Sequence, residues 1–224
     1  MAANDSALKA MFQKVYDSNV WAGPGAPKSG GGSTLENSSR AREAIKMAVT
    51  KYGVKTFIDS PCGDLTWMRT LFPWFEENGV KYIGVDVVKS EIDNHIEKYK
   101  KDFPTFEFFN YNLVTDLLPK ADMLFSRQAL QHMNVENNVR VLNNWKASGS
   151  KWLLQTTYTM DLAGMGEKQN FIHIDQGTSS LIDFSAEPYN FPPPVEKWKE
   201  QDKMMNVQGE NLQMQEHLAL WALQ

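Results

Sequence analysis

One stretch of the sequence decides the fold of this chain: Lys55-Thr-Phe-Ile-Asp-Ser-Pro-Cys-Gly-Asp-Leu-Thr-Trp-Met68. Its apolar beginning, around Phe57, is typical of a buried strand that ends at Asp59. A turn through Pro61 follows, and the residues after Asp64 have the apolar spacing of a helix. The stretch therefore predicts a strand, a tight loop and a helix, the unit from which open α/β sheets are built.

A second strand, Lys81-Tyr-Ile-Gly-Val-Asp86, is predicted directly after this unit, and it ends in an acid. In an open α/β sheet, ligands bind at the carboxyl ends of the strands, and a glycine in the first turn lets the backbone approach them closely. Gly63 is the glycine that meets this need. The carboxylate of Asp86 can accept hydrogen bonds from two hydroxyl groups at once, as a ribose would present them.

These motifs resemble those of class I S-adenosylmethionine (SAM)-dependent methyltransferases. The resemblance is closest to a subfamily whose first motif reads D-x-P-C-G-D, matched here by Asp59-Ser-Pro-Cys-Gly-Asp64. It extends over nearly the whole chain, through Asp86, Leu124-Phe-Ser-Arg-Gln-Ala-Leu-Gln-His132, Ser29-Gly-Gly-Gly-Ser-Thr34, Leu117-Leu-Pro119, Asn190-Phe-Pro-Pro-Pro194 and Leu218-Ala-Leu-Trp221. It implies a Rossmann-like three-layer α/β sandwich with a seven-stranded, mainly parallel sheet, an antiparallel last strand and an N-terminal helical lid.

The resemblance also implies a SAM cofactor and the residues that hold it. The sequence departs from the wider pattern where Pro61 replaces a glycine and where Asn112 and Gln128 stand in place of acids. An asparagine can still accept from and donate to an adenine edge. The cofactor-binding residues implied are Trp21, Ser33, Asp59, Pro61, Cys62, Gly63, Asp64, Asp86, Val87, Asn112, Leu113 and Ser126. Asp64 can serve either as a helix cap or as a partner of the SAM ammonium group, and we interpret Cys62 as a small packed residue.

The acceptor of the methyl group is predicted to lie against the residues that follow the fourth strand. Arg127 suits a carboxylate or phosphate on the acceptor, and its buried charge requires an anionic partner, for which Asp59, Asp64 and Asp175 are candidates. His132 is either a general base or a packed residue of the pocket. We expect His132 and Arg127 to be catalytic and the substrate to contact Arg127, Gln128, Tyr158, His173 and Asp175.

The sequence disfavours one class of substrate and also a metal site. The Asn/Asp-Pro-Pro-aromatic motif of methyltransferases that modify adenine or glutamine amino groups is absent after the fourth strand. His173 and Asp175 have the spacing of two metal ligands, but a single pair is a weak signal, so no metal is expected. The predicted reaction is methyl transfer to an oxygen or nitrogen of a small molecule.

The N-terminal region divides into a helix and a Gly/Pro-rich segment. Ser6 is predicted to cap a helix that runs to about Ser18 with an apolar stripe of Leu8, Met11, Phe12 and Val15. Residues 21–33 are too rich in glycine and proline for a helix or strand and can be either a tether or a lid. The resemblance favours a lid, so we divide the chain into a lid at residues 1–33 and a methyltransferase domain at residues 34–224.

The remaining elements follow from apolar periodicity and from turn residues. Predicted helices begin at Thr34 or Ser38 and end at Gly53, run over Lys89–Lys101 with Ile92, Ile96 and Tyr99 inward, and run over Val135–Ala147 with Val139, Leu142 and Trp145 inward. Predicted strands are Phe106–Tyr111, Asp122–Ser126, Lys151–Thr157, Leu181–Phe184 and His217–Trp221, with Pro192–Pro194 as a rigid cover between the last two.

Composition limits the classes of partner. The chain has 224 residues, a net charge of −4 and one cysteine. Its length fits one domain, and its acidity provides no basic stripe for nucleic acid. No apolar run approaches the length of a membrane span, and the beginning of the sequence does not read as a secretion signal, so we expect a cytoplasmic protein with a small-molecule partner. The composition does not fix an oligomeric state.

Two alternatives remain open from the sequence. A nicotinamide-dependent oxidoreductase shares an acid at the end of its second strand but requires a G-x-G-x-x-G turn that this chain lacks. A SAM-binding module without catalysis is suggested by Asn112 and Gln128, which stand where acids are expected.

Overall fold

The computed structural model describes residues 2–23, 25–160, 180–207 and 210–223. Seven strands form one sheet in the order β3-β2-β1-β4-β5-β7-β6. All neighbours from β3 to β5 pair in parallel, whereas β7 is antiparallel to both β5 and β6. The strands are β1 (Thr56–Asp59), β2 (Lys81–Asp86), β3 (Glu107–Asn110), β4 (Met123–Ser126), β5 (Trp152–Met160), β6 (Glu196–Val207) and β7 (Glu210–Ala222).

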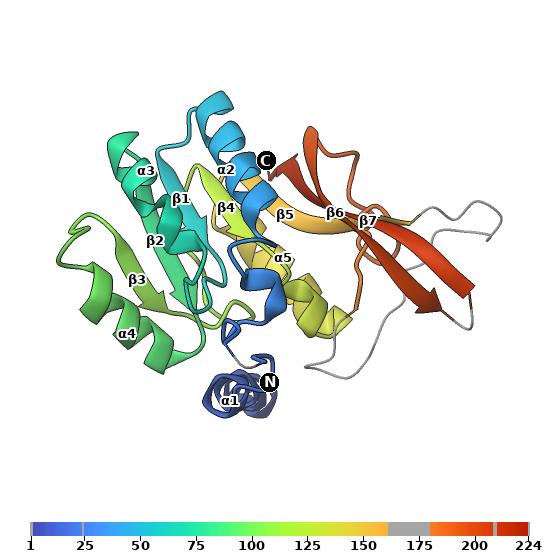
Figure 1. The fold of residues 1–224 in the computed structure, drawn as a ribbon, viewed down its shortest axis with the longest axis horizontal. Helices are drawn as coiled ribbons and strands as arrows, with labels where there is room; N and C mark the ends of the chain where they lie inside the picture. The colour runs from blue at the N-terminus through green and yellow to red at the C-terminus, as the bar shows by residue number, and fades with distance from the viewer. Residues whose placement is uncertain (1, 24, 161–179, 208–209, 224) are drawn as a thin grey trace.

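Helices cover both faces of the sheet and so make the three-layer sandwich that the sequence predicts (Figure 1). On one face, α2 (Ser39–Lys51), α3 (Phe72–Glu77) and α4 (Lys89–Tyr99) enclose an aromatic-rich core around Phe57 and Tyr82. On the other face, α5 (Val135–Ala147) packs Trp145 against Ile58 and Leu124. Because β1 is central and apolar on both sides, its carboxyl end is positioned by both cores.

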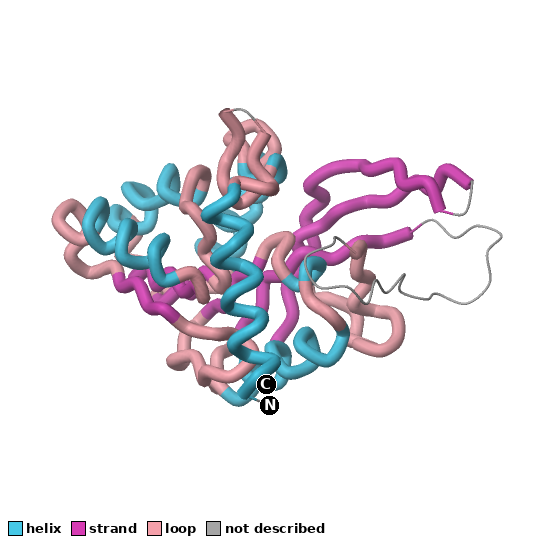
Figure 2. The backbone as a smooth tube through the Cα atoms, turned by 90° about the horizontal axis from the view of Figure 1, so that it is seen from below, coloured by secondary structure: helices cyan, strands magenta, loops and turns pink. Residues whose placement is uncertain are grey.

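The first helix, α1 (Ala2–Ser18), lies across the carboxyl ends of the central strands, near the ends of β1 and β4 (Figures 1 and 2). It begins before Ser6, so the prediction that Ser6 caps it is wrong. Leu8 is buried with the core on the α5 side, and Val15 and Tyr16 pack with Val88. The apolar stripe of α1 is therefore buried against the loops that follow the strands.

Two helical faces differ from the prediction. In α4, His95 is buried and Ile96 is exposed, because the inward positions are Glu91, Ile92 and His95. In α5, Val139 is exposed while the neighbouring stripe through Val141 packs inward. The other predicted inward residues are confirmed: Ile92, Leu142 and Trp145 are buried, and Tyr99 packs against the core.

The predicted strand Leu181–Phe184 is wrong: this segment has no strand structure, and the sixth strand is β6. β5 extends beyond the end of β4, and there Tyr158 donates its backbone N–H to the carbonyl of Ile182 at 2.9 Å. The segment therefore packs beside β5 through a few contacts. The three prolines Pro192–Pro194 precede β6 and do not lie between the last two strands.

No helix in the described ranges is both long and apolar enough to cross a membrane. Among the same residues, no group of three or more His, Cys, Asp or Glu side chains is arranged to hold a metal ion.

Candidate functional site

A cavity opens where β1, β2 and β4 end, beneath α1 and the Gly-rich segment. It encloses about 990 Å³ of empty space, including its opening to solvent. The sequence-predicted residues that line it are Trp21, Ser33, Asp59, Pro61, Cys62, Gly63, Asp86, Val87, Asn112, Leu113, Arg127, Gln128 and His132. The lining residues that were not predicted as site residues are Leu8, Phe12, Tyr16, Ser29, Trp67, Val114, Phe125, Ala129 and Met133.

The loop after β1 is fixed by backbone hydrogen bonds that leave its glycine facing the cavity. Cys62 donates its N–H to the carbonyl of Val85 at 2.9 Å, and Gly63 donates its N–H to the carboxylate of Asp86 at 3.0 Å. Gly63 has φ +60°, where a side chain is strained, and a Cβ there would lie 3.1 Å from the hydroxyl of Tyr16. The turn therefore requires a glycine at this position.

Asp86 is the acid at the end of β2, and both of its carboxylate oxygens accept backbone hydrogen bonds. One oxygen binds Gly63, and the other accepts the N–H of Val88 at 2.9 Å. Burial raises the pKa of Asp86 to about 6, and the two backbone donors limit this rise. Each oxygen has a second acceptor direction, so the group can still bind ribose hydroxyls.

A second buried acid, Asp59, lies beside it at the end of β1. Its carboxylate accepts the hydroxyl hydrogen of Tyr82 at 2.8 Å. Burial raises the pKa of Asp59 well above its usual range, and the Asp86 carboxylate raises it further. Burial also raises the pKa of the Cys62 thiol, which agrees with the interpretation of Cys62 as a packed residue and not a nucleophile.

His95 of α4 supports the glycine turn, and no sequence pattern identified it. Its Nε2 lies 2.7 Å from the carbonyl oxygen of Gly63, and its side chain is buried. Burial lowers the pKa of His95, so at neutral pH the ring is uncharged and its Nε2–H donates to Gly63. In the sequence, His95 is visible only as a histidine within a predicted amphipathic helix.

Two predicted cofactor residues do not line the cavity. Asp64 accepts from the backbone N–H and the hydroxyl of Ser29, and from the N–H of Thr66 at 3.0 Å. It is not a cap of the following helical turn, which begins at Met68 without a side-chain cap. Ser126 is fully buried, and its hydroxyl has no partner within the described residues.

Asn112 lies at the cavity after β3, but its oxygen is already engaged. The side-chain oxygen accepts the N–H of Val114 at 3.0 Å, and the backbone N–H of Asn112 donates to Asp116 at 2.8 Å. Asn112 therefore shapes the loop after β3, and its side-chain NH₂ group is what it can offer an adenine edge.

The N-terminal region forms one wall of the cavity through aromatic side chains. Trp21 stacks on His132 with ring centroids 4.5 Å apart and an angle of 29°. Phe12 of α1 meets the edge of Trp21 at 6.1 Å. Ser29, which binds Asp64, and Ser33 line the same cavity. The N-terminal region therefore contributes side chains to the cavity wall, and its role as a lid stays a prediction.

Arg127 lies at the cavity, but its charge is paired with Glu200, an acid that was not among the predicted partners. Its Nε donates to Glu200 of β6 at 2.8 Å, and the guanidinium lies over the ring of Trp67. The prediction that Asp59 or Asp64 pairs with Arg127 is therefore wrong. Asp175, the third predicted partner, lies outside the described residues. This ion pair was not predicted because Glu200 is far from Arg127 in the sequence and lies on β6, an edge strand that was not predicted.

The other predicted substrate residues are distributed differently. Gln128 donates from its side-chain amide to Glu216 of β7, and it lines the cavity. Tyr158 does not line the cavity: its hydroxyl donates to the side-chain oxygen of Gln131 at 2.9 Å, and burial raises its pKa. His173 and Asp175 lie outside the described residues.

Comparison with solved structures gives the fold. The methyltransferase domain of a bacterial Hen1 protein matches with a TM-score of 0.54 at 13% identity, over 83% of this chain and 100% of its own. The N-methyltransferase NodS of Bradyrhizobium japonicum matches with 0.51 at 11%, over 84% and 98%. Human N-acetylserotonin methyltransferase in complex with SAM matches with 0.51 at 11%, over 83% and 53%.

The strand order and these similarities define the chain as having the Rossmann-like α/β fold of class I methyltransferases. No known protein family and no curated protein sequence matches the chain. The D-x-P-C-G-D subfamily therefore rests on the sequence resemblance alone.

Proposed function

We propose that the protein is a SAM-dependent methyltransferase that transfers a methyl group to an oxygen or nitrogen of a small-molecule acceptor. The observation that supports this most is the pairing of Gly63 with Asp86 at the floor of the cavity. It joins a glycine turn of left-handed conformation to a buried acid at the ends of two adjacent strands. This is where an open parallel sheet binds a nucleoside.

The residues present fit the cofactor. Asp86 would accept the ribose hydroxyls with the acceptor directions that the backbone leaves free, and the glycine turn would let the methionine part pass close to the chain. Leu113 and Val87 provide apolar surface for the adenine, and Asn112 provides an amide donor. SAM supplies a methyl group already activated by its sulfonium. The protein's tasks are to align the acceptor and to remove a proton where the acceptor carries one.

His132 is the candidate for proton removal. It lies at the cavity in the turn after β4, and its ring is held by the stack with Trp21. An imidazole is suited to accept a proton near neutral pH. Gln128 cannot serve as a base, and its amide is engaged by Glu216.

The acceptor class follows from the charges around the cavity. Asp59 and Asp86 are acidic, and the guanidinium of Arg127 is paired with Glu200. An anionic acceptor would have to compete with Glu200 for Arg127, so uncharged acceptors belong in the same panel as anionic ones. Nucleic acid is disfavoured by the net charge of −4.

The oxidoreductase is the weaker alternative because the chain lacks the G-x-G-x-x-G turn and places an antiparallel strand beside β5. A binding module without catalysis differs from the enzyme only in turnover. The test is release of S-adenosylhomocysteine (SAH) from SAM, measured against a panel of hydroxyl- and amine-bearing metabolites, charged and uncharged. Acceptor-dependent release supports the enzyme, and tight SAM binding without turnover on any acceptor supports the binding module.

A further inference from the structure

A buried ion pair connects the end of β4 to the edge strand β6. Arg127 donates from Nε to both carboxylate oxygens of Glu200, at 2.8 and 3.2 Å. The two side chains are 3% and 1% exposed. Because a buried charge is stable only with a well-placed counter-ion, each of these residues depends on the other.

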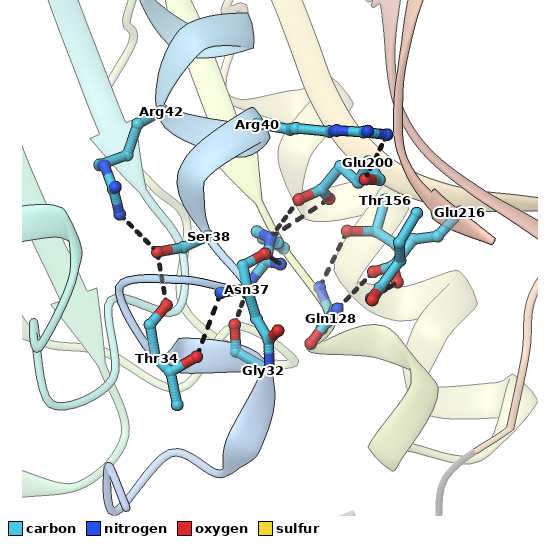
Figure 3. Close-up of polar contacts among 12 residues, drawn as sticks. Gly32, Thr34, Asn37, Ser38, Arg40, Arg42, Gln128, Thr156, Glu200 and Glu216 are labelled. Atoms are coloured by element: carbon cyan, nitrogen blue, oxygen red, sulfur yellow. Dashed lines mark hydrogen bonds and ion pairs between the residues drawn. The ribbon is translucent and has the colours of Figure 1, made fainter. Parts of the chain in front are cut away.

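The same guanidinium also binds two backbone carbonyls of residues 31–38. Figure 3 shows the residues that accept from it, Gly32, Asn37 and Glu200. Its Nη1 donates to the carbonyl of Gly32 at 2.9 Å, and its Nη2 donates to the carbonyl of Asn37 at 3.2 Å. Both acceptors lie in the turns before α2. In these turns the Thr34 hydroxyl accepts the N–H of Asn37, and the Ser38 hydroxyl donates to the Thr34 carbonyl. One paired charge therefore joins β4, β6 and residues 31–38.

Gln128 adds a second contact to the same glycine. Its backbone has φ 52°, and its N–H donates to the hydroxyl of Thr156 at 3.0 Å, so the side chain is aimed at Glu216. A Cβ on Gly32 would lie 2.0 Å from the side-chain oxygen of Gln128. The absence of a side chain at Gly32 is what lets the segment and the Gln128 amide occupy adjoining space.

We propose that Arg127 and Gln128, held by Glu200 and Glu216, are positioning residues that fix segment 29–38 as a wall of the cavity. Ser29 and Ser33, two cavity-lining residues, lie in this segment. The pair at Glu200 thus connects the far edge of the sheet to the cofactor side of the site. The effect on SAM rests on the proposed function, whereas the effect on the segment does not.

The first test is hydrogen–deuterium exchange of the full chain carrying Glu200→Gln, with Glu196→Gln as the matched control. Glu196 lies on the same strand and pairs with Lys51 at the surface, where its side chain is 29% exposed. In Glu200→Gln, the amides of Gly30, Ser33 and Ser38 should exchange at least ~10-fold faster, since local opening becomes easier. Glu196→Gln should leave them unchanged.

The second test is Gly32→Ala, with Gly31→Ala as its control, because Glu200→Gln can unfold the protein. A Cβ on Gly31 meets nothing within 4 Å, whereas one on Gly32 must displace Gln128. Gly32→Ala should raise exchange in the same segment and weaken SAM affinity by roughly tenfold in calorimetry, and Gly31→Ala should do neither. Unchanged exchange in both folded variants overturns the proposal. Raised exchange with unchanged SAM affinity overturns the positioning role. A wild-type protein that binds no SAM refutes the proposed function, and the exchange rates then still show whether Arg127 and Gln128 fix segment 29–38.

Discussion

Asp86→Asn is the substitution whose outcome the structure determines most closely. The aspartate oxygens both accept backbone N–H groups, from Gly63 and Val88. An asparagine offers one oxygen and one NH₂, so one of these backbone donors must face another donor. The substitution also removes the charge that we expect to accept the ribose hydroxyls.

The expected loss can be estimated from the carboxylate's bonds. Hydrogen bonds to a charged group contribute about 1.5–3 kcal/mol, so loss of one such contribution should weaken SAM binding by about 10–150-fold. The wild-type affinity should also depend on pH, because burial raises the pKa of Asp86 to about 6. If only the ionised form binds ribose, the apparent affinity at pH 5 should be about tenfold weaker than on the plateau above pH 7.

The same shift predicts the sign of a stability effect. With a folded-state pKa of about 6 against a usual 3.8, the folded protein holds this proton more tightly than the unfolded chain. The contribution of Asp86 to the free energy of unfolding therefore falls as the pH rises from below 3.8 to above about 6, by about 3 kcal/mol in total.

The assay is calorimetric titration with SAM from pH 5 to pH 7.5. Asp93→Asn is the matched control, because Asp93 is an α4 surface acid with a 58% exposed side chain that pairs with Lys89. Asp86→Asn should be weaker and lose the pH dependence, and Asp93→Asn should match the wild type. A folded Asp86→Asn protein with wild-type affinity, or a wild type with no pH dependence in this range, would refute the assignment of Asp86.

Three further outcomes are expected. Deleting residues 1–33 removes Leu8, Tyr16 and Trp21 from the cavity, so the remaining domain should fold and bind SAM more weakly, and normal binding and turnover would make the segment a tether. His132→Ala should lower turnover with SAM affinity nearly unchanged, and equal loss of both would place the ring in the cofactor pocket. His95→Leu should lower the free energy of unfolding by about 1–3 kcal/mol in urea titrations, because it removes the His95 hydrogen bond to the Gly63 carbonyl. His95→Gln, which keeps an amide donor, should lose less, and equal losses would contradict the role of this bond.

The sequence predicted the central part of the fold because its signals are local. The first strand, its glycine turn and the acid of the second strand are read within about thirty residues, and Gly63 and Asp86 lie together as expected. β6 was missed because charged residues such as Lys199 and Asp202 are common on an edge strand and hide its apolar alternation.

The site residues that escaped prediction are those set by distant contacts. The partner of Arg127 lies 73 residues away, on that edge strand. His95 was missed because the inward face of α4 was placed at Ile96, its neighbour. Tyr16 escaped prediction although the apolar stripe of α1 requires a surface to pack against, and Leu8 and Phe12 of that stripe line the cavity beside Tyr16.

Direct titration of the full chain with SAH is the best test of whether the cavity at the ends of β1 and β2 binds SAM. We expect one binding site per chain, competition between SAH and SAM, and no binding of NAD. Binding of NAD in place of SAH, or of neither, would contradict it.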